Sequence, residues 1–326
     1  MKLLSIIMPT YNRLSTLKIT IPIILEQVNR HPDLTELVIC NNASTDGTID
    51  YINSTFDKEQ NLRVVDYDKY VDVSESINRA ASNSDGKFLL LWGDDDIPSP
   101  MMVDTILLYL EKYPDISCLV FNRLQGHMCD SSYMNRLSVF DNIYNGEAVL
   151  ESSDVFIHRH YEAMGFLSVN VIATDSWKKG LKLLERDYPG YNWLAIMLFG
   201  IVGSNGLYVN FPLCAQRVVG KPEYFVMWPI YGFVGIPRLL MDCEKKGLLQ
   251  DWKNSWRNYQ FNYKSLLKFI VVVMRCSQNK SIYKPYLDEM CSYQESGFRR
   301  MWMRLCINYM PGWVEKVFWK IINVVR

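Results

Sequence analysis

The first 122 residues alternate short, continuous apolar runs with longer stretches whose apolar positions recur at helical spacing. An uninterrupted apolar run is typical of a strand that is buried on both faces of a parallel sheet. The runs predict strands over residues 3–8, 34–40, 62–66, 88–92 and 116–122. The stretches between them predict helices over residues 14–28, about 45–54, 73–83 and 101–112. This alternation predicts βαβ units, and therefore an α/β fold with a mostly parallel sheet flanked by helices.

The alternation weakens after residue 123. Residues 123–165 are polar, with one helix predicted over 147–158. The pattern then predicts a strand over 166–173, a helix over 175–184, a buried helix over 193–202 and a short strand over 208–211. Beyond Pro229 we expect helices to the end of the chain. The longest apolar run, 193–202, has about half the length of a membrane-spanning helix, so we expect no such helix.

Three adjacent carboxylates, Asp94, Asp95 and Asp96, follow the strand predicted over 88–92. They repel one another and lose hydration at the end of a buried strand, unless a cation or hydrogen-bond donors offset the cost. Oxygen ligands favour a hard divalent ion, Mg²⁺ or Mn²⁺. Open α/β sheets place their ligands at the carboxyl ends of strands. We therefore predict a metal and ligand site here, with a solvated acidic turn as the alternative.

The formal net charge of zero conceals an asymmetry along the chain. Residues 1–250 carry a net charge of −8, and residues 251–326 carry +8. A basic segment of this kind predicts an anionic partner, such as nucleic acid, phospholipid or a lipid-linked phosphate. The eight cysteines form no CxxC pair and no signal peptide is evident, so we expect free thiols in a reducing cytosol.

Four segments, at residues 6–13, 38–48, 86–92 and 94–96, follow one another in a recognisable order. Together they resemble the nucleotide-sugar-binding half of family 2 glycosyltransferases, over about residues 3–122. That resemblance implies a GT-A fold with a Rossmann-like sheet, to which the pattern beyond Pro229 adds a helical C-terminal region. The Asn-Ala-Ser-Thr-Asp-Gly-Thr string at 42–48, and the glycine before the Asp cluster, are most similar to abequosyltransferase-like enzymes of surface-polysaccharide assembly.

The resemblance implies that two loops hold the donor. Pro9, Thr10, Tyr11 and Arg13 would bind the base and the diphosphate, with Tyr11 stacking and Arg13 contacting phosphate. Asn41 stands where the family usually has an aspartate that accepts the uracil N3–H. We expect a pyrimidine base. Because an amide can either accept or donate a hydrogen bond, Asn41 does not indicate whether the nucleotide is UDP, dTDP or CDP.

Further roles follow from the same resemblance. Asp96 would bind the implied cofactor, Mn²⁺ or Mg²⁺, with Asp94 as a possible second ligand. Asp95 would contact the ribose or the metal. Arg217 would reach the diphosphate, with a surface role as the alternative. Asp66 would contact the base, or would only end a strand.

The turn over residues 41–47 leads into the second predicted helix. Ser44 or Thr45 is expected to cap that helix. Asp46 is expected to be a turn and cap residue rather than a ligand contact.

The reaction implied by the family is inverting displacement of a nucleoside diphosphate from an anomeric carbon. The leaving group gains charge that the metal would neutralise, and the acceptor hydroxyl needs a base to take its proton. In many members that base belongs to a Glu-Asp pair before a buried helix. Here the segment 185–193 holds that place without such a pair. Asp187 is the first candidate for the base and Glu185 the second, and a solvated charge is the alternative for either.

The C-terminal segments 298–305 and 313–326 mix Trp, Phe and Ile with Lys and Arg. This mixture is typical of a helix in a membrane interface, with packing against the catalytic domain as the alternative. We therefore expect a lipid-linked oligosaccharide acceptor and an anionic membrane surface as partners. The enzyme would be cytoplasmic and peripheral on the inner face of the cytoplasmic membrane, in O-antigen or capsule synthesis.

The expected domains are a catalytic GT-A domain over 1–220, with a donor half 1–122 and an acceptor half 123–220, and a helical, basic region over 221–326. One alternative function is a nucleotidyltransferase, although the loop after the first strand lacks the glycines that such enzymes use. A second is a non-catalytic nucleotide-sugar-binding module. A nucleic-acid binder is disfavoured because no known module is present and residues 1–250 are acidic.

Overall fold

The structure is a computed structural model that describes residues 1–125, 128–129, 132–133, 148–217, 226–258 and 266–314. The chain divides into two compact units. The N-terminal unit comprises Met1–Glu185 and Asn192–Gly220. The C-terminal unit comprises Arg186–Tyr191 and Lys221–Arg326, so a short segment of the middle of the sequence belongs to it.

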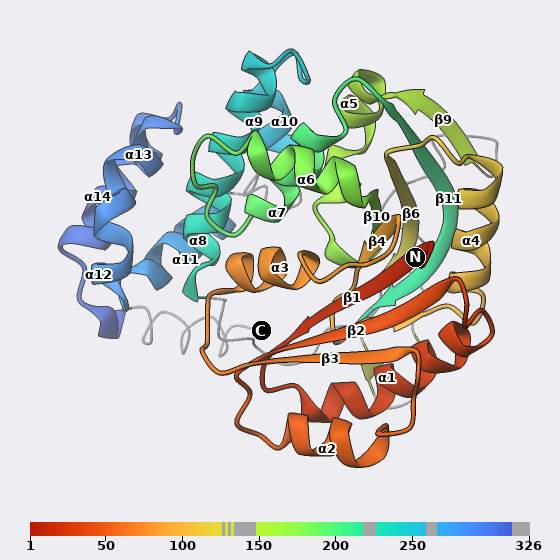
Figure 1. Cartoon of the computed structure of the whole chain (residues 1–326). Coiled ribbons are helices and arrows are strands. Elements are labelled where there is room, and N and C mark those ends of the chain that lie inside the picture. The colour runs from red at the N-terminus through yellow and green to blue at the C-terminus, as the bar shows by residue number, and fades with distance from the viewer. Residues whose placement is uncertain (126–127, 130–131, 134–147, 218–225, 259–265, 315–326) are drawn as a thin grey trace. The chain divides into compact units, whose positions relative to one another are not determined.

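The N-terminal unit is built on a twisted sheet whose first four strands are parallel (Figure 1). Their order is β3-β2-β1-β4, so the chain leaves β1 on one side and returns to its other side. Continuous apolar runs form these strands, and β2 and β4 are buried at every position. The four strands are β1 (Leu4–Thr10), β2 (Thr35–Asn42), β3 (Leu62–Tyr67) and β4 (Phe88–Leu91).

Beyond β4 the same sheet becomes mixed. Strand β10 (Asn170–Ala173) lies antiparallel between β4 and β6 (Cys118–Gln125). Strand β11 (Asn205–Gln216) runs parallel to β6 and pairs with two antiparallel strands. Those two are β5 (Ile97–Pro98) and β9 (Ala148–Ser152), and a separate hairpin joins β7 (Met128–Cys129) to β8 (Ser132–Tyr133). The predicted α/β class is confirmed.

Helices cover both faces of the sheet (Figure 1). Helices α1 and α2 lie on one face, and α3 lies on the opposite face with α6 and α7. Helix α7 is buried at every position, as its apolar run predicted. The helices of this unit are α1 (Leu14–Asn29), α2 (Thr48–Thr55), α3 (Val73–Ala81), α4 (Met102–Lys112), α5 (Ser153–Met164), α6 (Thr174–Lys182) and α7 (Asn192–Gly200), with a 3₁₀ turn at Leu167–Val169.

Apart from the turn at Arg186–Tyr191, the regular structure described in the C-terminal unit is helical. Its core is apolar, with Phe233, Phe269, Met290 and Cys306 all buried. None of the described helices combines the length and the apolar character needed to cross a membrane. The helices are α8 (Trp228–Ile230), a π-helical turn (Tyr231–Gly235), α9 (Ile236–Lys245), α10 (Trp252–Asn258), α11 (Leu266–Cys276), α12 (Lys280–Tyr283), a 3₁₀ turn (Lys284–Tyr286), α13 (Leu287–Ser292) and α14 (Gly297–Asn308).

Three sequence predictions differ from the structure. The helix predicted over 147–158 is wrong in its first part, because Ala148–Ser152 pair with β11 as strand β9 and α5 begins only at Ser153. The strand predicted over 208–211 is the middle of a longer strand, β11, whose register shifts around Pro212. The cap predicted at Ser44 or Thr45 is wrong, because Gly47, with φ of 84°, is the N-cap of α2. Glycine adopts this left-handed conformation without the steric cost that other residues have.

Candidate active site

The strand order of the N-terminal unit locates a ligand crevice before any side chain is considered. Strands β1 and β4 are neighbours, but β2 and β3 lie on the far side of β1. In open α/β sheets, ligands bind at the carboxyl ends of the strands where the order reverses in this way. The loop after β1 and the Asp94–Asp96 cluster after β4 both lie at that reversal.

Asp94 is tied to the end of β1 and to the first helix. Thr10 Oγ1 donates a hydrogen bond to Asp94 Oδ2 at 2.6 Å, and Thr10 is buried. Thr20 Oγ1, on α1, lies 3.2 Å from the Asp94 carbonyl oxygen and donates to it. The side chain and the backbone of Asp94 are therefore both fixed by hydroxyl groups from the β1–α1 segment.

Asp96 is buried and held from two directions. Ser168 Oγ donates to Asp96 Oδ2 at 2.6 Å, and the Ser168 Oγ itself accepts from the Gly93 N–H at 2.8 Å. The Arg217 N–H donates to the other carboxylate oxygen at 3.3 Å. A Cβ on Gly93 would lie 3.0 Å from Asp96 Oδ2, so glycine at this position lets the loop close against the carboxylate.

Arg217 also reaches across the cluster with its side chain. Its Nε donates to the Asp95 carbonyl oxygen at 2.8 Å. Its Nη2 is buried and has no hydrogen-bond partner among the residues that the structure describes. A buried guanidinium nitrogen with an unused donor, next to a ligand crevice, is suited to an anionic oxygen such as that of a phosphate.

Burial and mutual repulsion disfavour the charged forms of these carboxyl groups. Burial, with the nearby charge of Asp95, raises the pKa of Asp94 to about 7 and that of Asp96 to about 8. Burial likewise raises the pKa of Asp95, although the charges of Arg13 and Arg217 oppose this. The cluster therefore carries its full negative charge near neutral pH only when cations or donors compensate it.

The donor set of this cluster fits a magnesium or manganese ion. In the described residues no three His, Cys, Asp or Glu side chains are already arranged around a metal position. Mg²⁺ and Mn²⁺ do not require such a cage, because they are bound through one or two carboxylates together with substrate phosphates and water. Asp96 and Asp94, both carboxylates at the end of β4, can supply those ligands.

The loops after β1 and β2 are joined by hydrogen bonds. The Asn12 N–H donates to Ser44 Oγ at 2.9 Å, and the Thr45 N–H donates to Asn12 Oδ1 at 2.8 Å. Asp46 accepts from the Leu14 N–H and from Thr48, as expected of a turn and cap residue. Burial opposes the ionisation of Asp46, but these hydrogen bonds outweigh it and hold its pKa below the usual range.

Asn41 and Asp66, at the ends of β2 and β3, form a pair. Asn41 is 1% exposed, its Nδ2 donates to Asp66 Oδ1 at 2.7 Å, and its Oδ1 accepts from the Ser44 N–H at 3.3 Å. Asp66 is exposed. Tyr11 packs against Tyr70, with ring centroids 4.7 Å apart. The buried amide therefore fixes an exposed carboxylate at the end of the neighbouring strand.

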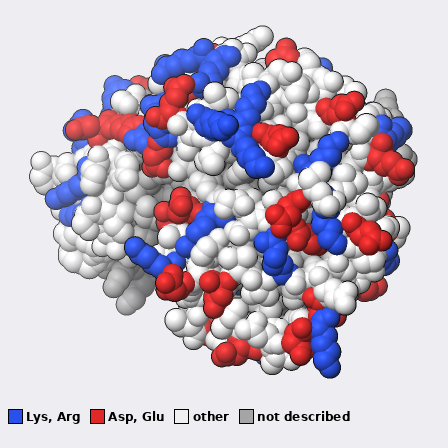
Figure 2. Space-filling model, in the orientation of Figure 1, with Lys and Arg blue, Asp and Glu red and all other residues white. Residues whose placement is uncertain are grey.

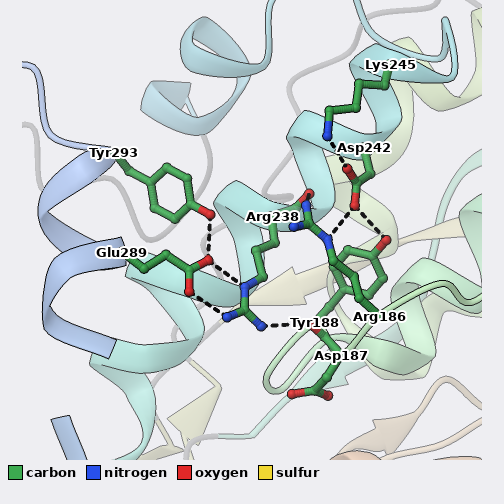
Figure 3. Close-up of polar contacts among 8 residues, drawn as sticks. All are labelled: Arg186, Asp187, Tyr188, Arg238, Asp242, Lys245, Glu289 and Tyr293. Atoms are coloured by element: carbon green, nitrogen blue, oxygen red, sulfur yellow. Dashed lines mark hydrogen bonds and ion pairs between the residues drawn. The ribbon is translucent and has the colours of Figure 1, made fainter. Parts of the chain in front are cut away.

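The two candidate bases fall in different units. Glu185 is exposed and ends the first segment of the N-terminal unit, whereas Asp187 belongs to the C-terminal unit. There the Arg238 Nη1 donates to the Asp187 carbonyl oxygen at 2.9 Å, and Figure 3 shows the Asp187 carboxylate directed away from Arg238. The identity of the base stays a prediction.

The neighbours of Asp187 form a polar network within the C-terminal unit (Figure 3). Arg186 and Tyr188 both donate to Asp242, at 2.7 Å and 2.9 Å. Arg238 binds the Glu289 carboxylate with two nitrogens, as Figure 3 shows. Arg186 and Tyr188 therefore anchor the segment around Asp187 to α9. The Asp187 carbonyl is also bound by Arg238, whose guanidinium binds Glu289 of α13 as well.

Sequence reasoning did not find two residues of the site. Ser168 lies 72 positions from Asp96, and a lone serine in a weakly patterned stretch carries no signal. Arg123, on β6, is 1% exposed and its guanidinium lies over the Phe166 ring, 4.1 Å from the centroid. Its charge lowers the pKa of Asp96 against the effect of burial.

The sequence comparison decides the family. Residues 5–158 match the sequence profile described as Glycosyl transferase family 2. Residues 5–158 therefore form a family 2 glycosyltransferase domain. The resemblance deduced from the four motifs is confirmed, and the class of enzyme with it. A search of curated protein sequences gives no match. The finer similarity to abequosyltransferase-like enzymes stays a prediction.

Solved structures of similar fold include TarS and a mannosyltransferase. TarS residues 1–349 from S. aureus is 13% identical, with a TM-score of 0.57 over 98% of this chain and 92% of that one. Its complex with UDP-GlcNAc is also 13% identical and gives a TM-score of 0.59 over the same shares, 98% and 92%. The mannosyltransferase PcManGT from Pyrobaculum calidifontis, in complex with GDP-Man and Mn²⁺, is 14% identical, with a TM-score of 0.51 over 97% and 87%. These likenesses establish the GT-A fold.

Proposed function

We propose that this glycosyltransferase moves a sugar, with inversion, from a nucleotide-diphosphate donor to a hydroxyl of a lipid-linked oligosaccharide in surface-polysaccharide synthesis. The observation that carries the proposal is the fixed carboxylate cluster at the reversal of strand order, beside the unused donor of Arg217. This combination can bind a diphosphate together with its metal ion, because carboxylates bind the cation and a guanidinium binds phosphate oxygens. TarS has been solved in complex with UDP-GlcNAc and PcManGT in complex with GDP-Man and Mn²⁺, which supports a donor of this class.

In this proposal Asp96 and Asp94 hold a divalent ion, and Arg217 and Arg13 contact the diphosphate. When bound, the ion neutralises the charge that develops on the departing nucleoside diphosphate. The hydrogen bonds from Ser168, Thr10 and the Arg217 backbone keep the two carboxylates in place before the substrate arrives. This preorganisation avoids rearrangement of the ligands during the reaction. Asp187 or Glu185 takes the proton of the acceptor hydroxyl.

The donor base lies, in this proposal, between the paired loops after β1 and β2, with Tyr11 as the stacking ring. Asp66 is the group that accepts a base N–H, and Asn41 holds it in position, because Asn41 is buried and Asp66 is exposed. A pyrimidine with an N3–H, uracil or thymine, would satisfy this acceptor. Thermal-shift titration with UDP, dTDP, CDP and GDP in Mn²⁺ tests it. We expect a response to UDP or dTDP, and a response to GDP alone or to CDP alone would contradict the proposal, because cytosine has no N3–H.

The test of the catalytic proposal is the variant Asp96→Asn, assayed for sugar transfer and donor hydrolysis with and without Mn²⁺. Loss of one ligand charge should weaken the ion and lower kcat/KM about a hundredfold or more, without unfolding the protein. The matched control is Asp57→Asn, at an exposed turn after α2, which should leave the rate unchanged. Near-normal, metal-dependent turnover of Asp96→Asn would refute the assignment. Donor binding without any turnover of the wild type would favour a non-catalytic binding module.

A further inference from the structure

One helix of the C-terminal unit carries an exposed apolar face. We call the exposed apolar side chains of this helix the α14 face. Along α14 and at its C-cap they recur every three or four positions, and this spacing places neighbours on one side of a helix. We include Trp313, which is exposed in the short turn that follows Pro311. The face comprises Phe298 (42% exposed), Met301 (57%), Leu305 (42%), Tyr309 (77%) and Trp313 (64%). Large apolar groups that stand together on a surface in this way mark a binding surface.

The opposite side of α14 already accounts for the packing of the helix. Met303, Cys306 and Ile307 are buried in the core of the C-terminal unit. Trp302 anchors the helix at its flank, because its Nε1 donates to the Ile270 carbonyl oxygen at 3.4 Å. The α14 face is therefore not required to hold the helix in place, and its exposure costs stability unless something covers it.

The positive charge of α14 and the residues after it favours an anionic partner. Residues 297–326 contain six Lys and Arg residues and one acidic residue, and three of the basic residues, Arg299, Arg300 and Arg304, lie on α14 itself. On the face drawn in Figure 2, much of the surface over α12 is uncharged, and basic side chains stand beside acidic ones near α13 and α14. Of the three arginines, Arg304 pairs with Asp288 of α13 at 2.9 Å. Two copies packed through α14 would bring these arginines together, which disfavours self-association.

We infer that the α14 face docks on an anionic lipid bilayer. Phe298, Met301 and Leu305 enter the headgroup–acyl boundary, and Tyr309 and Trp313 lie at the level of the headgroups, where amphipathic rings are favoured. The basic residues of the segment add attraction to anionic lipids that salt screens. The biological role of this docking, which is to bring the enzyme to its acceptor, rests on the proposed lipid-linked acceptor. The docking itself does not depend on the reaction.

The experiment measures flotation of the full-length protein with phosphatidylcholine vesicles, with and without phosphatidylglycerol. The test variant combines Phe298→Ser, Met301→Ser and Leu305→Ser. The matched control combines Ile19→Ser, Leu108→Ser and Phe211→Ser, which are exposed apolar residues of the N-terminal unit. We expect the α14 variant to lose binding to anionic vesicles about tenfold or more, and the control to bind like the wild type.

Unchanged vesicle binding by the α14 variant would overturn the inference, as would equal wild-type binding to vesicles with and without phosphatidylglycerol. A wild-type dimer that the α14 variant dissociates, with vesicle binding unaffected, would show a second copy as the occupant instead. If the variant fails to fold, hydrogen exchange of the wild type decides: vesicles should protect residues 297–309, and no protection refutes docking. Nucleotide binding is measured separately by thermal shift. The docking inference can therefore be tested even if the proposed enzymatic function is wrong.

Discussion

The hydroxyl of Ser168 connects the backbone of the Asp cluster to one of its carboxylates. It accepts from the Gly93 N–H and donates to Asp96 Oδ2, and Ser168 is fully buried. We predict that Ser168→Ala raises the Mn²⁺ concentration for half-maximal activity about tenfold, because Asp96 loses the bond that orients it. Metal titration of the transfer rate measures this.

The control for that prediction is Ser153→Ala. Ser153 is also buried, and its Oγ accepts from the Gly203 N–H at 2.9 Å, away from the Asp cluster. Both variants leave a glycine N–H without its partner, so both should lose about 1–2 kcal/mol of stability. Only Ser168→Ala should change the metal dependence. If the two variants respond equally to Mn²⁺, Ser168 is structural and does not position Asp96.

His160 predicts a pH-dependent contribution to stability. It is 2% exposed, stacks on Tyr208 of β11 with ring centroids 4.2 Å apart, and lies 3.0 Å from the Glu151 carboxylate of β9, which also pairs with Arg159. Burial lowers the pKa of His160 to about 4, against the opposing effect of Glu151. Between this value and the ordinary pKa of about 6.5, the unfolded chain binds a proton that the folded one does not.

The stabilising effect of neutral His160 is therefore complete above about pH 6.5 and is lost as the pH falls towards 4, by up to about 3 kcal/mol. Urea unfolding at a series of pH values should show a flatter pH dependence for His160→Gln than for the wild type. The exposed neighbour His158 provides the control, since His158→Gln should keep the wild-type slope. Equal slopes for His160→Gln and the wild type would contradict the prediction.

At the residue scale, the sequence predicted site residues that are adjacent in the chain and missed those that only the fold brings together. Asp94, Asp95 and Asp96 are adjacent and follow an apolar run, so their position at a strand end could be predicted. Ser168 could not be predicted, because the 3₁₀ turn that carries it is placed by packing against β4 rather than by its own sequence pattern. The pairing of Asn41 with Asp66 also depends on the register of β2 and β3, which no local pattern states.

At the scale of elements, continuous apolar runs identified the buried parallel strands and the buried helix α7. The pattern was weaker at the edge of the sheet. Strand β9 is only partly buried and its sequence lacks a long continuous apolar run, so its residues were wrongly predicted to begin the helix over 147–158. Strand β11 contains Pro212 at a shift of register, which made it look short. The residue preferences and the spacing of apolar positions predict regular helices and strands well. The bounds of irregular strands are determined by the strands that pair with them, which the local sequence does not show.

The packing of α6 on α7 gives a prediction at this scale. A Cβ at Gly180 would lie 1.8 Å from the Ile196 carbonyl oxygen, and one at Gly200 would lie 2.1 Å from the Ser176 carbonyl oxygen. Both contacts are with backbone, so the two helices would have to separate. We predict that Gly180→Ala destabilises the protein by about 1–3 kcal/mol or more, although alanine favours helix by about 1 kcal/mol.

Thermal or urea unfolding measures this effect. The control is Gly297→Ala at the start of α14, where only the far end of Arg300 lies within 4 Å of the new Cβ at 3.9 Å. That substitution should leave stability unchanged or raise it slightly. A Gly180→Ala protein as stable as the Gly297→Ala protein would show that α6 and α7 do not pack as closely as described.

At the scale of the whole molecule, the two units have different chemistry. The Asp cluster, Arg217 and the Asn41–Asp66 pair all lie in the N-terminal unit, whereas the basic excess lies in the last 76 residues. The charge asymmetry was visible in the sequence. The assignment of Arg186–Tyr191 to the C-terminal unit was not visible, because it follows from three-dimensional contacts such as those of Arg186 and Tyr188 with Asp242.

This separation predicts the effect of removing residues 315–326. The deleted segment carries Lys316, Lys320 and Arg326 against Glu315, together with Phe318 and Trp319, and it leaves the α14 face and Val314 in place. Each basic residue near an anionic surface contributes about 1 kcal/mol, so the loss of a net two positive charges should weaken vesicle binding about thirtyfold at low salt and less at high salt. Turnover on a lipid-linked acceptor should fall with it, as measured on vesicles that contain the acceptor.

Donor binding should survive the same deletion, because every described residue of the donor site lies in the N-terminal unit. The thermal shift that UDP and Mn²⁺ produce should therefore equal that of the full-length protein, and turnover on a soluble acceptor analogue should be unchanged. A truncated protein that binds vesicles normally would place the electrostatic attraction elsewhere in the C-terminal unit. One that loses the nucleotide-induced shift would show that the segment supports the catalytic unit rather than the membrane contact.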